Sequence, residues 1–186
     1  MGMYHRHGVQ STAAIAGHPL HHMLVAFPIA FLIGAFGTDI AFTLTQDPFW
    51  AQGAYWLLIA GIVTAVVAAI PGMVDFVTID RVRNLWISWA HMAVNLTVVA
   101  LALVNVGVRL YNPIGGLQEW GIWLSGAQTA LLLFSGWLGG EMSYRYGIGA
   151  IRDYSLKAEQ FHVEIDRPDV AAAYGRRTGT DNAQSR

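Results

Sequence analysis

Residues 54–73 read AYWLLIAGIVTAVVAAIPGM and contain no charged side chain. A helix of about 20 mostly apolar residues is long enough to cross the hydrocarbon core of a bilayer. This stretch therefore predicts a transmembrane helix, which the pair Pro71-Gly72 is expected to close. Three further runs of the same character lie at residues 19–43, 85–108 and 118–140. The sequence thus predicts an all-α fold, a four-helix transmembrane bundle whose short connections pair neighbouring helices in antiparallel order.

The composition agrees with a membrane protein. Hydrophobic residues make up 54% of the 186 and charged residues only 12%, whereas globular domains average about 25% charged residues. A formal net charge of −1 provides no basic field for nucleic acid, so no nucleic-acid partner is expected. The absence of cysteine excludes disulfides, thiolate zinc sites and iron–sulfur clusters, and it leaves histidine as the side chain able to bind a metal through nitrogen.

The distribution of positive charge predicts the orientation, because Lys and Arg near the ends of membrane spans are retained in the cytoplasm. Of the 11 Lys and Arg residues, all but Arg109 fall on the side of the N-terminus. We therefore expect a multi-pass protein of the bacterial inner (cytoplasmic) membrane with both termini in the cytoplasm. Tryptophans that suit the two membrane interfaces agree with this orientation: Trp50, Trp56, Trp120 and Trp123 outside, and Trp86, Trp89 and Trp137 inside.

Three segments follow from this topology. Residues 1–17 form a cytoplasmic N-terminal segment that does not resemble a cleaved signal peptide. Residues 18–147 form the four-helix transmembrane domain. Residues 148–186 form a cytoplasmic tail that is amphipathic and charged to about His162 and small, polar and basic from Gly175. We expect the tail to be disordered or held by a partner.

Three histidines cluster where the first span begins, in the segment His18-Pro19-Leu20-His21-His22. Proline suits the first turn of a helix, so His18 is expected just before the helix and the other two on its first turn. Neighbouring helical residues point about 100° apart, so at most one of His21 and His22 should point into the bundle together with His18.

His91 is the second centre of interest. It lies about 12 Å along the third helix from Arg83, inside the hydrocarbon. It is part of one polar and small stripe, which should face protein rather than lipid: Asn84, Ser88, His91, Asn95, Val98, Ala102, Asn105 and Arg109. The first and third helices begin on the same side, so His91 and the N-terminal histidines are expected at comparable depths.

Several roles for these side chains are open. His91 can be a neutral imidazole hydrogen-bonded to a neighbouring helix, or an axial ligand of a b-type haem whose second ligand is His18, His21 or His22. We take His22 and His91 as the candidate metal ligands and Asn95 as a further cofactor-binding residue. A non-haem metal site, a quinone pocket and a proton path are the remaining possibilities.

Other polar groups accompany this layer. Asp75, Glu141 and Arg145 form a candidate polar cluster: Asp75 can cap a loop or pair with Arg81 or Arg145, and Glu141 and Arg145 are spaced for a helical salt bridge. Pro28 is expected to open a kink by leaving the Leu24 carbonyl without its helical partner. Asp39, near the outer end of the first helix, is expected to reach the interface or cap a packing contact.

The combination of several motifs resembles a known family, the bacterial four-helix membrane proteins catalogued as domain of unknown function 2231. The resemblance covers roughly residues 15–150 and implies the fold but no assigned activity. Some relatives are joined to Rieske-type iron–sulfur domains, which implies an electron-transfer setting. Tyr146 stands where many relatives carry histidine, which puts a second haem in doubt. The motifs are His18-Pro19-Leu20-His21-His22, Phe27-Pro28, Pro71-Gly72-Met73-Val74-Asp75, His91, Gly139-Gly140 and Gly147-Ile148-Gly149.

Two hypotheses follow. The first is an electron-transfer subunit that binds b-type haem between the first and third helices near the cytoplasmic face. The second is a non-catalytic structural or accessory subunit of a larger membrane complex, without a cofactor. In both, the lipid bilayer is a partner, and the chain forms a homo-oligomer or joins a larger complex. The sequence contains no Gly-x-Ser-x-Gly elbow, His-Glu-x-x-His or phosphate-binding loop, so it indicates no hydrolase and leaves enzymatic activity open.

Overall fold

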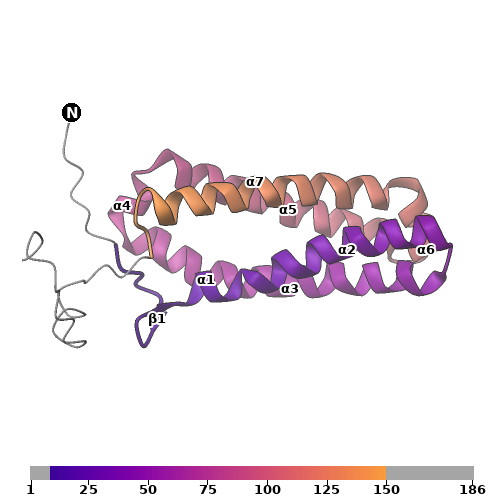
Figure 1. The fold of residues 1–186 in the computed structure, drawn as a ribbon, viewed down its shortest axis with the longest axis horizontal. Helices are drawn as coiled ribbons and strands as arrows, with labels where there is room; N and C mark the ends of the chain where they lie inside the picture. Colours follow the sequence, from indigo (N-terminus) through magenta and orange to yellow (C-terminus); the bar gives the residue numbers. More distant parts are fainter. Residues whose placement is uncertain (1–8, 150–186) are drawn as a thin grey trace, which may run out of the picture. The chain divides into compact units, whose positions relative to one another are not determined.

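The computed structural model describes residues 9–149 of the chain, and the expected tail lies almost wholly outside them. Four long helices dominate the described part: α2 (Ala26–Thr45), α3 (Pro48–Thr78), α5 (Trp86–Arg109) and α7 (Ile122–Tyr144) (Figure 1). Shorter elements connect or extend them: α1 (Leu20–Leu24), α4 (Asp80–Arg83), α6 (Pro113–Gly116) and the π-helical turn η1 (Leu117–Gly121).

The long helices form two pairs. In Figure 1, α2 runs beside α3 and α5 runs beside α7, and the closest packing in the bundle is within these pairs. We call the end that carries His21, His22 and His91 the histidine end and the opposite end, which carries Arg109, the arginine end. The four predicted apolar runs thus correspond to four long helices.

Three helical segments of the described part are long and apolar enough to cross a membrane. They are Leu20–Thr45, in which α1 and α2 are counted together, Pro48–Thr78 and Trp86–Arg109. The helix α7 is 23 residues long and is not among these three segments. Its polar residues Ser125, Gln128 and Ser135 are buried inside the bundle.

Local chemistry explains the turn between α2 and α3. Gln46 ends α2 in the left-handed conformation, with φ of 56°. The Asp47 side chain then caps α3 by accepting a hydrogen bond from the Phe49 N–H at 2.9 Å, and Pro48 occupies the first helical position. An acidic N-cap followed by proline is a strong helix start, because proline lacks an N–H that would otherwise be unpaired there.

Two prolines act differently within the helices. The prediction that Pro71 closes the second helix is wrong, since α3 continues through this buried residue to Thr78. Proline removes one helical N–H, but burial within the bundle keeps the chain helical on both sides. Close to Pro28, where a kink is expected, the helix is interrupted at Val25, between α1 and α2.

An apolar core separates the two ends of the bundle. Gly61 brings α2 and α3 together, because a Cβ atom at this position would lie only 2.4 Å from Cδ2 of Leu32. Such close backbone approach is what small residues provide in membrane helix packing. The core consists of Leu32, Ala35, Leu58, Val98, Ala102 and Leu132.

Residues 9–19, which we call the N-terminal strap, cross the histidine end before α1 begins. The short strands β1 (Ala14–Ile15) and β2 (His18–Pro19) form an antiparallel hairpin. Val9 pairs with the segment after α7, with Val9 N 2.9 Å from Gly147 O and Gly149 N 2.8 Å from Val9 O. The strap therefore links the start of the described chain to its end.

Candidate functional site

The structure brings one histidine of the first helix next to His91. His21 on α1 and His91 on α5 have ring centroids 6.5 Å apart, with ring planes nearly perpendicular at 87°. Both side chains are partly buried. Two imidazoles from helices far apart in the sequence thus meet at the histidine end.

Each of these two imidazoles is oriented by a backbone carbonyl. Nδ1 of His21 lies 2.8 Å from the Ala68 carbonyl oxygen, and Nδ1 of His91 lies 3.1 Å from both the carbonyl oxygen and the Oγ of Ser135. A carbonyl oxygen only accepts hydrogen bonds, so in the neutral rings the hydrogen is on Nδ1 and the lone pair is on Nε2. This is the arrangement in which proteins hold histidine ligands of metals.

The other two histidines have different surroundings. Nε2 of His22 lies 3.1 Å from Oγ of Ser143, so this imidazole reaches towards the end of α7. Its ring centroid is 6.0 Å from that of His21. His18 is exposed, with Nδ1 3.0 Å from the Ala16 oxygen. Of the three N-terminal histidines, His21 therefore has the position beside His91 that suits a pair of ligands.

A glycine lies opposite each of the three imidazoles, and two of the three leave space that a side chain would fill. A Cβ atom at Gly72 would lie 2.7 Å from Nδ1 of His21, and one at Gly149 would lie 2.7 Å from Cε1 of His22. At Gly139 it would lie 3.4 Å from Cε1 of His91. These glycines belong to the Pro-Gly, Gly-Gly and Gly-Ile-Gly motifs in the sequence. In the sequence these motifs formed part of the family resemblance, and no histidine was assigned to any of them.

Asn95 supports the site from behind His91. Its side-chain amide donates hydrogen bonds to the His91 carbonyl at 2.8 Å and to Oγ of Ser135 at 2.7 Å. These contacts link α5 to α7 at the level of the imidazole. One turn before His91, the buried Ser88 hydroxyl has no hydrogen-bond partner among residues 9–149.

The remaining candidate residues do not form one cluster. Asp75 anchors the N-terminal strap by accepting hydrogen bonds from Oγ of Ser11 at 2.7 Å and from the Ala13 N–H at 2.9 Å. The predicted salt bridge between Glu141 and Arg145 is confirmed, at 3.0 Å, on α7. The acids and Arg145 thus serve the strap and the surface of α7 separately.

Two imidazoles meet at the histidine end, and they are the nitrogen donors that a haem would take from the protein. In the described part of the chain, no group of three or more His, Cys, Asp and Glu residues is arranged to hold a metal ion. A bare ion needs about four ligands, whereas a porphyrin supplies four nitrogens and asks the protein for axial ligands alone. His21 and His91 would be the residues that hold such a group, and it would supply one-electron chemistry there.

A second polar centre lies at the arginine end. Arg109 on α5 donates two hydrogen bonds of 2.7 Å to the carboxylate of Asp39 on α2. Its Nε donates to Oδ1 of Asn105 at 2.8 Å, and its Nη2 donates to Oγ of Ser125 at 3.2 Å. All four side chains are fully buried. The prediction that Asp39 reaches the interface or caps a packing contact is wrong, because the carboxylate has a cation at its own depth.

Gly121 makes this ion pair possible. A Cβ atom there would lie 2.6 Å from Nη2 of Arg109. The glycine belongs to η1, so an irregular helical turn borders the buried guanidinium. Sequence reasoning missed the pair, although Asp39 and Arg109 are an isolated acid and an isolated base in the outer halves of their helices.

Comparison with known proteins gives one finding. A family model described as a predicted membrane protein, DUF2231, matches residues 17–152. Comparison with curated proteins and with solved structures finds no match. The matched range includes the four long helices and all the histidines considered above.

Proposed function

This chain belongs to the DUF2231 family of predicted membrane proteins, and we propose that it is an electron-transfer subunit that binds one b-type haem between α1 and α5. The observation that carries the proposal is the pair His21 and His91, in which both rings use Nδ1 for a backbone carbonyl and keep Nε2 for a ligand. When bound, the haem supplies a centre that accepts and releases one electron.

The chain's own residues fix the two imidazoles. The carbonyls of Ala68 and Ser135 set the tautomer and the direction of each ring. Gly72 and Gly139 allow the helix backbones to approach the rings. The partial burial of both rings lowers their contact with water, and solvent exposure is one of the properties by which proteins tune a haem potential. The N-terminal strap covers the same end of the bundle.

An absorption spectrum of the purified protein tests the proposal. We expect a Soret band, with α and β bands on reduction. His91→Ala and His21→Ala should each abolish or displace these bands, whereas the exposed His18→Ala should leave them unchanged. Thermal unfolding and size-exclusion profiles of each variant show that a lost band does not reflect a lost fold. A colourless wild-type protein after expression with sufficient haem overturns the proposal.

The proposed topology has four spans with both termini in the cytoplasm of a bacterium. The fourth span is α7, whose polar residues face the bundle interior. The chain has no cysteine, so single cysteines report sidedness directly. Tyr111→Cys, at a position 95% exposed, should react with a membrane-impermeant maleimide on intact spheroplasts. Asp80→Cys, whose native side chain is 80% exposed at the histidine end, should react only after lysis. The reverse pattern overturns the orientation.

A second candidate function, a structural or accessory subunit without a cofactor, is favoured by one specific observation. The hydrogen bonds to Ala68 and Ser135, with the edge-to-face contact of the rings, already give both imidazoles protein partners. A purified protein that is colourless but folded, and that forms a homo-oligomer or copurifies with a larger membrane complex, supports this candidate.

A further inference from the structure

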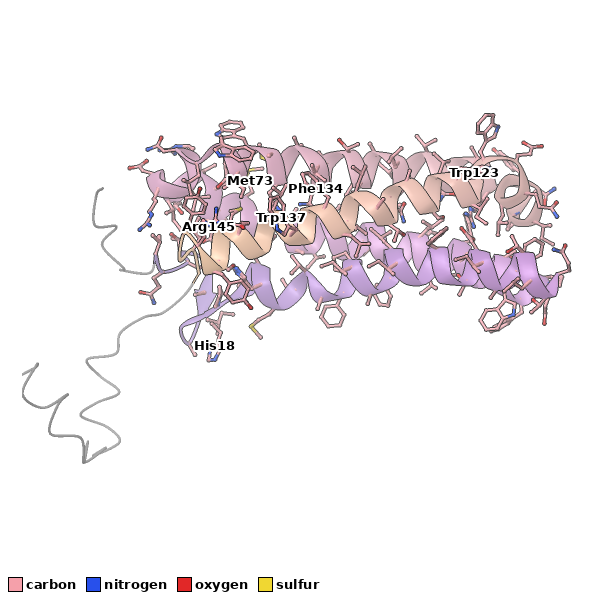
Figure 2. All side chains as sticks on the ribbon, turned by 45° about the horizontal axis from the view of Figure 1, so that its top comes forward. His18, Met73, Trp123, Phe134, Trp137 and Arg145 are labelled. Carbon is pink, nitrogen blue, oxygen red and sulfur yellow. The ribbon has the colours of Figure 1, made fainter. Side chains whose placement is uncertain are left out.

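An open groove of about 570 Å³ lies on α7 close to the histidine end. Figure 2 shows two of its residues, Trp137 and Arg145, near one end of the bundle. Its lining side chains recur at helical spacing, so they lie on one face of α7. They are Trp137, Gly140, Glu141, Tyr144 and Arg145.

Gly140 is the one lining residue without a side chain. A Cβ atom at this position would find only Cδ2 of Tyr144, at 4.0 Å, so nothing in the described structure requires glycine here for packing. Trp137 and Tyr144 are 59% and 86% exposed, and the Trp137 ring is stacked on that of Phe134, with centroids 6.0 Å apart. Exposed aromatic rings that line a hollow on an outward helix face suit a flat ligand.

The groove is separated from His91 by little more than one helix backbone. Gly140 lines the groove, whereas a Cβ atom at the preceding residue, Gly139, would lie 3.4 Å from Cε1 of His91. Neither glycine adds a side chain between the two. A ligand in the groove is therefore separated from the His91 imidazole by the backbone of α7.

The charge of the groove argues for a neutral ligand. Nε of Arg145 lies 3.0 Å from Oε2 of Glu141, so the cation and the carboxylate compensate each other. An anionic phospholipid headgroup would meet the carboxylate as well as the cation, so its net electrostatic attraction to the groove would be small. The lining nevertheless contains neutral or compensated donors: the Trp137 indole N–H, the Tyr144 hydroxyl and the remaining N–H groups of Arg145.

We propose that this groove binds the ring of a membrane quinone, a neutral, flat and lipid-soluble ligand with two carbonyl acceptors. The aromatic side chains contact the ring faces, and the donors bind its carbonyl oxygens. The proposal deepens the proposed function, because it names the class of redox partner for a haem held by His91, and it rests on that function for this role. Binding of the quinone itself is independent of haem.

A photoreactive azido-quinone tests the site in the full-length protein reconstituted in nanodiscs. We expect crosslinking, mapped by mass spectrometry, to fall within residues 137–145 and to be suppressed by excess ubiquinone-1. Gly140→Leu fills the groove and should weaken labelling by about tenfold or more. The matched control is Gly136→Leu, one turn earlier on α7, where a Cβ atom meets nothing within 4 Å. It should label like the wild type.

Each outcome bears on the proposal. Labelling that ubiquinone-1 does not suppress, or that is equal in the Gly140→Leu and Gly136→Leu variants, overturns it. Suppression by phosphatidylglycerol but not by ubiquinone-1 overturns it in favour of a lipid headgroup. Labelling does not depend on bound haem. A colourless protein that labels as expected therefore overturns the haem proposal and supports the quinone site. A coloured protein that fails to label supports the haem proposal and overturns the quinone site.

Discussion

Arg109 and Asp39 form a two-pronged ion pair, with two hydrogen bonds of 2.7 Å and both side chains fully buried. The pair joins α5 to α2 at the arginine end. Asn105 and Ser125 occupy further donors of the guanidinium, so most of its N–H groups are satisfied. A pair of this kind fixes the register of two helices, because no other described position on α2 offers the arginine a carboxylate.

Removing one member of this pair should be costly. Arg109→Met leaves a buried carboxylate without its cation and is expected to destabilise the fold by about 3–5 kcal/mol. The double variant Asp39→Leu with Arg109→Met removes both charges and should recover most of that loss. Unfolding by denaturant in detergent micelles measures both. The control is Arg145→Met, whose exposed pair with Glu141 should contribute no more than about 0.5 kcal/mol. Equal losses in the single and double variants would contradict the ion-pair argument.

Gly72→Ala should displace His21. The new methyl group would lie 2.7 Å from Nδ1 of the imidazole, so the hydrogen bond to Ala68 has to break or α1 has to shift. We expect a loss of about 1–3 kcal/mol in unfolding free energy. Gly53→Ala is the matched control on α3, where the methyl group meets nothing within 4 Å and alanine favours the helix by up to about 1 kcal/mol. A Gly72→Ala protein as stable as the control, with an unshifted His21 ring resonance, would refute this packing.

Asn95 and Ser135 should be energetically coupled. The amide donates to the serine hydroxyl at 2.7 Å across the interface between α5 and α7. A double-mutant cycle with Asn95→Ala and Ser135→Ala is expected to give a coupling free energy of about 1 kcal/mol. Strictly additive losses would show that the hydrogen bond does not stabilise the interface.

Asp75→Asn should loosen the N-terminal strap. The carboxylate accepts bonds from the Ser11 hydroxyl and the Ala13 N–H, and an amide can replace only one of its two acceptor oxygens. Hydrogen–deuterium exchange of residues 9–19 is expected to become faster, while exchange in α2 and α5 stays unchanged. Asp80→Asn, at an exposed position, serves as control. Unaltered protection of the strap would mean that its hairpin and its pairing with Gly147 hold it without Asp75.

Hydropathy predicted the long helices because each of them carries apolar side chains along its whole length. It could not predict the length of α3, since the effect of Pro71 depends on what packs around it. Because neighbouring helical residues point about 100° apart, the sequence predicted that His21 and His22 face different partners. Which one meets His91 depends on the rotation of α1, and α1 is offset from α2 by the interruption at Val25.

Pairings of side chains between helices that are not adjacent in the sequence could not be predicted either. The buried pair of Asp39 and Arg109 joins residues 70 positions apart, and no local pattern encodes that distance. The glycine motifs carried a signal, since Gly72, Gly139 and Gly149 each lie opposite an imidazole. This signal could not be interpreted before the histidine opposite each glycine was known.

The pairing of Val9 with Gly147 and Gly149 brings the two ends of the helical domain to the same place. A short peptide can therefore join residue 149 to residue 9, and new ends can be opened in the turn between Thr45 and Pro48. Such a circular permutant keeps all the helix contacts while its termini move to the opposite end of the bundle. In the natural order, a domain fused before residue 9 or after residue 149 starts from the same end of the bundle.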